Sequence, residues 1–324
     1  MIHRVQRSGA EVLKAAVVGA GAFGRLHASK YKGLPGVELI AVADTNADAR
    51  RHFQIGGGLR AVADWRELLG HVDLVSVCSP ASTHAMIVRA FLNSGAHVLV
   101  EKPIATDVYE ADALIALAER TGKVLTVGHQ ERFVFAKTGL LEFTDLPKEI
   151  SCWRLGPWTG RGADVSVVLD LMIHDLDLVH RLVPDSISAV AARARSVHSR
   201  YADEAAAQLD FALGTRVRLD ASRVAGGRSR GMRVVYEDGQ IEIDFMSRKV
   251  RNTTARDLKP LEFDDPLGAS VAAFVDAVRG SSTTLVRPEE ARHALETALM
   301  IEDSADKMAA LESDRVHPVY AAAR

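Results

Sequence analysis

The amino-acid sequence predicts an α/β fold: a doubly wound parallel sheet in the N-terminal part, followed by an α+β domain with a mainly antiparallel sheet. An apolar run at residues 15–18 leads into a glycine-rich turn. Up to about His129, apolar strand patterns alternate with helical patterns, as in a parallel sheet. After about Val134, strand patterns follow one another and several alternate polar with apolar residues, which favours antiparallel pairing. We therefore expect two domains, residues 1–130 and 131–324.

The elements of the first domain are short apolar runs separated by helical patterns. Ligands of such sheets bind at the carboxyl ends of the strands, so the residues that follow each strand are candidate site residues. Residues 1–12 are expected to form a loose leader. The predicted strands are 15–19, 39–44, 59–62, 74–78, 97–101 and 124–128, and the predicted helices are 23–31, 48–53, 65–69, 83–94 and 107–119.

The second domain is expected to contain one early helix, a run of strands and two closing helices. Asp238-Gly239 is a typical hairpin turn between two of these strands. The predicted strands are 150–155, 188–197, 204–213, 216–224, 232–236 and 240–244, and the predicted helices are 167–182, 268–278 and 288–311.

The composition is that of an ordinary globular protein, with 48% hydrophobic and 25% charged residues among 324. A net charge of −2 argues against nucleic-acid binding. No run approaches the ~20 apolar residues that span a bilayer, and residues 1–11 lack a signal core. The two cysteines, Cys78 and Cys152, stand in unrelated contexts. We expect a cytoplasmic protein without disulfides and without a membrane partner.

The glycine-rich turn has the spacing of a dinucleotide-binding motif. Gly19, Gly21 and Gly24 follow the first strand, and Ala22 and Phe23 complete the turn. Such glycines allow a tight turn, a close approach of the backbone to a pyrophosphate, and close packing of the next helix. The helix N-terminus then offers free N–H groups to the anion.

Asp44 indicates which dinucleotide binds. It ends the second strand about 20 residues after the glycines, where a carboxylate hydrogen-bonds the adenosine ribose and repels a 2′-phosphate. NAD is therefore favoured over NADP. Arg50 and Arg51 leave NADP as the alternative, although a solvated helix face explains them equally simply.

Further motifs occur in a fixed order along the chain. Together with the glycine motif they resemble the Gfo/Idh/MocA family of nicotinamide-dependent sugar oxidoreductases over residues 14–310, which implies a Rossmann domain and an active site between two domains. The motifs are Gly19-Ala-Gly21-Ala-Phe-Gly24 followed by His27, Ser79-Pro80 with His84, Glu101-Lys102-Pro103, Arg132-Phe133, and Asp170-x-x-x-His174-Asp175.

The resemblance implies further contacts to the cofactor. Ser79, Pro80 and His84 follow the fourth strand, in the loop that the family uses around the ribose and nicotinamide. Glu101 precedes the motif lysine at the end of the fifth strand and is assigned to the same set. For His84, a helix N-terminal residue without a ligand is the alternative.

The resemblance also implies the catalytic residues. Lys102 contacts the reacting hydroxyl in the family, and an exposed loop lysine is the alternative. Asp170 and His174 are four apart on a helix that is apolar nearly all round, where ionisable groups are costly without a purpose. A surface ion pair is the alternative for these two. We assign His174 as general base, Lys102 as the group that polarises the oxygen, and Asp170 as orienting the substrate or the histidine.

No metal is expected at this site. Asp175 and Asp177 follow His174 closely and could be mistaken for metal ligands. Adjacent helical residues point in different directions, however, and no zinc-type spacing occurs. Capping or partner contacts explain them. Hydride transfer to a nicotinamide needs no metal.

A narrower resemblance concerns the substrate. Residues 127–133, 154–164 and 168–177 resemble the branch that oxidises UDP-N-acetylglucosamine at C3, ahead of an aminotransferase in lipid A precursor synthesis. Arg132 and Arg161 are then candidate contacts to the pyrophosphate, since the arginine fork matches phosphate oxygens. For Arg161 an ordinary exposed loop is the alternative. The branch often has Asn-Pro after Arg-Phe, whereas Val134-Phe135 stands here.

Two other functions remain open at this point. The first is a dehydrogenase of inositol or another unactivated sugar. The second is a non-catalytic NAD(P)-binding regulatory protein, against which the presence of Lys102, Asp170 and His174 argues. The family resemblance implies a homo-dimer or homo-tetramer, for which an exposed face of the antiparallel sheet offers a surface.

Overall fold

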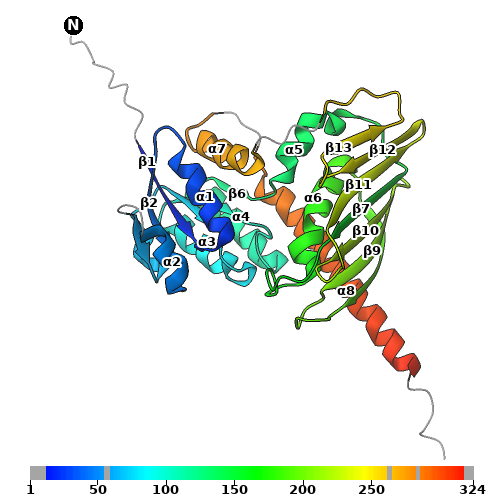
Figure 1. Cartoon of the computed structure of the whole chain (residues 1–324), viewed down its shortest axis with the longest axis horizontal. Coiled ribbons are helices and arrows are strands. Elements are labelled where there is room, and N and C mark those ends of the chain that lie inside the picture. The colour runs from blue at the N-terminus through cyan, green and yellow to red at the C-terminus, as the bar shows by residue number, and fades with distance from the viewer. Residues whose placement is uncertain (1–11, 55–58, 261–264, 282–284, 317–324) are drawn as a thin grey trace, which may run out of the picture. The chain divides into compact units, whose positions relative to one another are not determined.

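The computed structural model describes residues 12–54, 59–260, 265–281 and 285–316. Figure 1 shows the course of the backbone. The predicted loose leader lies outside the described residues except for Val12. The chain forms two compact units. The first unit comprises Met1–Glu101, Ala113–Gly128 and Leu267–Leu285, and the second comprises Lys102–Asp112, His129–Pro266 and Val286–Arg324.

The first unit is built on a six-stranded parallel sheet in the order β3-β2-β1-β4-β5-β6. This is the Rossmann order, and it reverses between β1 and β4, where such sheets bind their ligands. All six predicted strands are confirmed. They are β1 (Leu13–Val18), β2 (Val37–Ala43), β3 (Arg60–Val62), β4 (Leu74–Val77), β5 (His97–Val100) and β6 (Leu125–Val127).

The helices of this region follow the predicted pattern with one difference. The predicted helix at 65–69 is a 3-10 turn, η1 (Trp65–Leu68), whose backbone is capped by the Asp64 side chain. Four residues are too few to establish the α-helical ladder. The other elements are α1 (Ala22–Lys32), α2 (Ala47–Gln54), η2 (Ala81–Thr83), α3 (His84–Asn93) and α4 (Val108–Thr121).

Helix α7 (Pro266–Val278) belongs to the first unit although it lies far along the chain. Val271 and Phe274 are fully buried and share one core with Val17 of β1 and Tyr31 of α1. This differs from the expected division, which assigned every residue after 130 to the second domain. A helical pattern marks an apolar face but not the sheet that covers it.

The second unit is built on a seven-stranded sheet in the order β13-β12-β11-β7-β10-β9-β8. All pairs are antiparallel except β7 and β10, so the prediction of a mainly antiparallel sheet is confirmed. The strands are β7 (Glu149–Leu155), β8 (Ile187–Arg195), β9 (Glu204–Phe211), β10 (Arg216–Ser222), β11 (Ser229–Tyr236), β12 (Gly239–Asp244) and β13 (Lys249–Asn252).

The strands of this sheet alternate between a buried and an exposed face. In β10, Val217, Leu219 and Ala221 are buried while Arg216, Arg218 and Asp220 are exposed. Helix α8 contacts β8 on the buried side, where Ser304 donates to the carbonyl oxygen of Val190. In β10 the charged side chains lie on the opposite face.

After residue 128, the described residues of the second unit form five helical elements. The predicted helix at 167–182 begins as a π-helical turn, η4 (Val168–Met172), and continues as α6 (Ile173–Leu182). Neither α5 (Glu131–Thr138) nor strand β13 was predicted. The other two are η3 (Leu140–Glu142) and α8 (Pro288–Val316). No helix in the described part of the chain combines the length and apolar character needed to cross a membrane.

Candidate active site

The glycine turn after β1 has the geometry that a dinucleotide requires. Gly19 has a φ of +94°, and a Cβ there would lie 2.5 Å from the carbonyl oxygen of Cys78. A Cβ on Gly24 would lie 1.7 Å from the Gly19 carbonyl oxygen, so α1 packs closely on the turn. At Gly21 a Cβ would meet nothing within 4 Å. Gly21 is the N-cap of α1 and no side chain caps it, so the first turn of the helix, with Ala22 and Phe23, leaves its N–H groups to an anion.

Asp44 lies beside this turn, at the end of β2. Its Oδ2 accepts from the backbone N–H of Ala20 at 2.6 Å, and Oδ1 accepts from that of Asn46 at 2.8 Å. Nη1 of Arg50 donates to the carbonyl oxygens of Asp44 and Thr45. The carboxylate therefore faces the turn while the arginine is engaged by backbone, which suits NAD.

The loop after β4 is held by its own side chains. His84 is 1% exposed, and its Nε2 lies 2.9 Å from the carbonyl oxygen of Ser79. Thr83 donates to Ser79 Oγ at 2.7 Å. Pro80 is exposed at the N-terminal end of η2. For His84 this geometry supports the alternative role, in which the ring shapes the loop.

Glu101 ends β5 as a buried carboxylate. Its Oε1 lies 3.0 Å from Nε2 of His27, whose Nδ1 in turn lies 3.0 Å from Ser76 Oγ. A Cβ on Gly128 would lie 2.4 Å from the same Oε1. The motif residues His27 and Glu101 thus form a buried polar connection between α1 and β5.

Lys102 and Asp170 form the centre of the candidate catalytic site in the second unit. Lys102 Nζ donates to Asp170 Oδ1 at 3.0 Å and to the Asp170 carbonyl oxygen at 2.6 Å. Their side chains are 15% and 21% exposed, so the pair is sheltered but accessible. An ammonium has three N–H donors, and Asp170 accepts from two of them. The third remains available for a substrate oxygen.

His174 follows one turn after Asp170, in the first turn of α6. Its Nδ1 is buried and has no hydrogen-bond partner among the described residues. Burial lowers the pKa of His174 well below its usual range, and the charges of Lys102, Arg154, His129 and Arg230 add to this effect. The ring is therefore neutral near pH 7 and can accept a proton. Lys102, Asp170 and His174 come together within one unit.

Asp175, the residue after His174, belongs to a buried ion cluster with Arg154 and Glu131 that was not predicted. Arg154 on β7 is 2% exposed and donates to both carboxylate oxygens of Asp175, at 3.1 and 2.8 Å. It also donates to both oxygens of Glu131 on α5. Burial would lower the pKa of Arg154, but the two carboxylates outweigh it and raise the pKa well above its usual range. Asp175 thus contacts a charged partner, Arg154, in agreement with the structural role expected for it.

The anion role predicted for Arg132 is corrected by its contacts. Its Nε and Nη2 donate to Asp177, and its Nη1 donates to Glu290 on α8. Arg132 is only 9% exposed, so two carboxylates already occupy the fork. Sequence spacing could not reveal these partners, because Glu290 is 158 residues away. Arg161, by contrast, is exposed and forms no hydrogen bond or ion pair with the residues that the structure describes.

Two residues that sequence reasoning missed hold Asp170 in place. Gly162 has a φ of +67°, and a Cβ there would lie 2.2 Å from Asp170 Oδ2. Arg223, which is 5% exposed, donates to the carbonyl oxygens of Gly162 and Val165 and to Asp203 Oδ1. The only indication in the sequence is the glycine-rich stretch 157–162, which contains Gly162.

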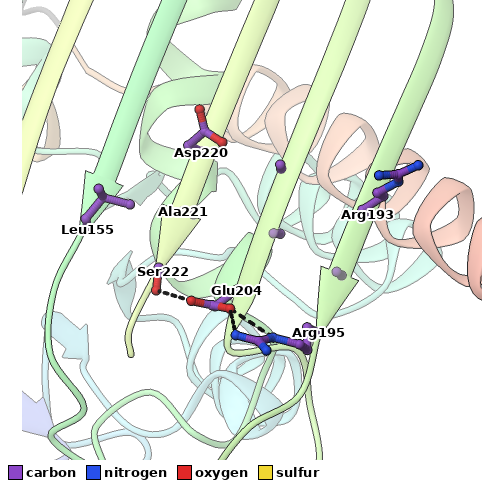
Figure 2. A pocket seen from close by; sticks show the side chains of 10 residues that line it. Leu155, Arg193, Arg195, Glu204, Asp220, Ala221 and Ser222 are labelled. Carbon is purple, nitrogen blue, oxygen red and sulfur yellow. Dashed lines mark hydrogen bonds and ion pairs between the residues drawn. The ribbon is translucent and has the colours of Figure 1, made fainter. Parts of the chain in front are cut away.

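A shallow pocket elsewhere in this unit contains none of the predicted site residues. It lies across the ends of β7, β8, β9 and β10, and Figure 2 shows that its charged side chains stand on the face away from the helix behind the sheet. Glu204 accepts there from Arg195 and from Ser222. Among the described residues, no group of three or more His, Cys, Asp or Glu side chains could hold a metal ion.

The sequence matches two family models in succession. Residues 13–129 match the oxidoreductase family with an NAD-binding Rossmann fold, and residues 145–242 match the GFO/IDH/MocA C-terminal domain. The chain belongs to the Gfo/Idh/MocA oxidoreductase family. The chain is therefore an NAD-dependent oxidoreductase. The predicted fold, family and cofactor are confirmed.

Individual Gfo/Idh/MocA relatives differ in their substrates. UDP-N-acetylglucosamine 3-dehydrogenase of Acidithiobacillus ferrooxidans is 35% identical over 72% of this chain and 75% of its own length. A solved structure of that enzyme has a TM-score of 0.81, with 30% identity over 91% of this chain and 98% of the other. Inositol 2-dehydrogenase 3 of Saccharopolyspora erythraea is 26% identical over 82% of this chain and 85% of its own length.

Proposed function

We propose that this protein oxidises a secondary hydroxyl of a nucleotide sugar with NAD, and that the substrate is UDP-N-acetylglucosamine, oxidised at C3 to the 3-keto sugar. The observation that carries the proposal is the Lys102–Asp170 pair beside a neutral His174. A sensor protein has no need of a sheltered ammonium with a spare donor next to a proton acceptor.

The chain's own residues then have distinct roles. His174 accepts the proton of the substrate hydroxyl. Lys102 donates its third N–H to the same oxygen and stabilises the negative charge that develops there. Asp170 fixes the direction of the ammonium through its carboxylate and its carbonyl oxygen. NAD held by the glycine turn and Asp44 would supply the acceptor for the hydride of the carbinol carbon.

Two observations support a nucleotide sugar over an unactivated polyol. The relative with 35% identity is named for UDP-N-acetylglucosamine, whereas the inositol dehydrogenase has 26% identity. In addition, Arg228 and Arg230 form no hydrogen bond or ion pair with the described residues, as described below. The product would be a substrate for an aminotransferase in lipid A precursor synthesis. We expect the protein to act in the cytoplasm as a homo-dimer or homo-tetramer.

The proposal is tested by following NADH formation with UDP-N-acetylglucosamine, UDP-N-acetylgalactosamine, UDP-glucose and myo-inositol as substrates. We expect reduction of NAD with UDP-N-acetylglucosamine and little or none with inositol. Reduction with inositol alone would support the dehydrogenase of an unactivated sugar instead. NAD binding without turnover of any sugar would support the regulatory alternative.

The variant Lys102→Met tests the assignment of the lysine. We expect turnover to fall by at least about 100-fold, since the charge that stabilises the developing alkoxide is lost. The thermal shift on adding NAD should stay unchanged, because the glycine turn and Asp44 are untouched. Lys148→Met, which removes a half-exposed lysine paired with Glu237, is the control. Full turnover by Lys102→Met would remove the lysine from the mechanism.

A further inference from the structure

The structure places two arginines directly opposite each other on neighbouring strands. Arg230 of β11 is the register partner of Arg154 of β7. Cross-strand partners stand on the same face of a sheet, and like charges directly opposite each other are destabilising. Arg154 points to the helix-covered face, since Asp175 of α6 accepts its hydrogen bonds. Arg230 therefore stands on that face as well.

The two arginines differ in their hydrogen-bond and ion-pair partners. Arg154 is saturated by Glu131 and Asp175. Arg230 is within electrostatic range of the same two carboxylates, yet it forms no hydrogen bond or ion pair with any described residue, and its side chain is exposed. Burial and the charge of Arg154 lower the pKa of Arg230 from its usual value. Nothing in the described part of the chain supplies the acceptors that this guanidinium lacks.

The position of Arg230 is close to the proposed chemistry. Its charge acts on the imidazole of His174, as does that of Lys102. The neighbouring Arg228 is exposed, has no partner among the described side chains, and packs at 3.9 Å from the Cβ position of Gly156. Gly156 begins the loop that leads to Gly162 and Asp170. Two arginines without partners among the described residues thus lie near the C-terminal end of β7, where this loop begins.

We propose that Arg230, together with Arg228, binds the diphosphate of the substrate and so selects a nucleotide sugar. This inference rests on the proposed function and gives it a recognition site. The planar fork matches phosphate oxygens in pairs, and an arginine placed opposite the like charge of Arg154 gains from a neighbouring anion. A neutral polyol has no group that would use it. The site takes the role that was first assigned to Arg132.

Arg230→Ala tests the proposal, and Arg233→Ala is its matched control. Arg233 stands on the same strand but on the opposite face, 3.7 Å from Glu242. In Arg230→Ala we expect the KM for UDP-N-acetylglucosamine and the Kd for UDP, measured by calorimetry, to rise about tenfold or more, with kcat at saturation changed far less. The unliganded Tm should stay or rise, because a like-charge pair is relieved. Arg233→Ala should leave both constants unchanged.

The outcomes separate this inference from the proposed function. If the wild type oxidises UDP-N-acetylglucosamine and Arg230→Ala behaves like Arg233→Ala, the arginine site is wrong and the proposed function stands. If the wild type does not turn over any UDP-sugar but binds UDP through Arg230, the anion site stands and the substrate is wrong. If D-glucuronate competes through Arg230 while UDP does not bind, the diphosphate assignment is wrong. If the wild type neither turns over any UDP-sugar nor binds UDP, both are overturned.

Discussion

At the scale of single residues, the proposed chemistry depends on one imidazole remaining neutral among cations. His174 lies within range of Lys102, Arg154 and Arg230, so protonating its ring would add a further positive charge to a partly buried cluster. Asp170 and the carboxylates of the ion cluster are already hydrogen-bonded to Lys102 and Arg154, and none of them accepts from His174. The ring is therefore kept neutral near pH 7, which is the form that a proton acceptor must have.

The pH profile of the reaction tests this arrangement. The group that accepts the proton must be unprotonated, so kcat/KM falls as the pH drops through the pKa of His174 in the free enzyme. Because that pKa is lowered, we expect the acidic limb well below the value of about 6.5 for an unperturbed histidine. His174→Gln should lose most of its turnover together with this limb. A wild-type limb at pH 6.5 or above would contradict the neutral-base assignment.

At the scale of elements, the turn η4 and the loop before it act together. The loop of residues 156–167 is fastened by Arg223, and its Gly162 leaves no space beside the Asp170 carboxylate. Asp170 stands in a π-helical turn, a rare conformation that is frequent at functional sites. Loop, turn and carboxylate together fix the direction of the Lys102 ammonium.

Gly162→Ala should damage turnover, and Gly160→Ala is its matched control. Both glycines have positive φ angles, +67° and +74°, so alanine should cost about 1–2 kcal/mol of stability at either site. Only at position 162 does the new methyl meet the Asp170 carboxylate; at 160 nothing lies within 4 Å. We expect kcat to fall about tenfold or more in Gly162→Ala alone. Equal kcat values in the two variants would show that the contact does not matter.

The elements that sequence patterns missed are those that depend on distant partners. Helix α5 has a short, mixed sequence, and its first residues are fixed by ion pairs to Arg154 and Asp177. Strand β13 has four residues, three of them polar, and pairs only with β12. The π-helical turn follows the same apolar pattern as an α-helix, so periodicity cannot distinguish them. By contrast, the parallel strands were predictable because each is mostly apolar.

The candidate site was predictable to the extent that its residues follow strands or share a helix. Gly19, Asp44 and Glu101 lie at the carboxyl ends of parallel strands, as expected. Lys102, Asp170 and His174 were proposed from family motifs and lie together. Sequence spacing cannot show which charged residues pair with each other. It led to the assignment of Arg132 as an anion contact, although Arg132 pairs with two carboxylates. It gave no indication of Arg230.

At the scale of the whole molecule, the first unit depends on a helix encoded far from its sheet. Phe274 of α7 is fully buried in the core that contains Val17 and Tyr31. Residues 1–130 alone would therefore leave part of that core exposed to water. The nucleotide-binding unit is complete only when the segment around α7 has been synthesised.

Phe274→Ala tests this dependence in the full chain. Removal of a buried phenylalanine should lower the free energy of unfolding by about 3–5 kcal/mol. Saturating NAD should recover part of the loss, because the cofactor binds only the folded first unit. Met300→Ala, which truncates a 40% exposed side chain on α8, should change stability by less than about 0.5 kcal/mol. The measurement is urea denaturation with and without NAD, and a loss below 1 kcal/mol in Phe274→Ala would contradict the packing.

The order in which the chain visits its two units has a consequence for how such enzymes can be recombined. The chain crosses from one unit to the other after residues 101, 112, 128, 266 and 285. A chimera that joins the front of one homologue to the back of another at a single junction would inherit a mismatched α7 against β1. Exchange of substrate preference between homologues should therefore succeed by grafting the segment from β7 to β11, and fail when everything after residue 130 is swapped.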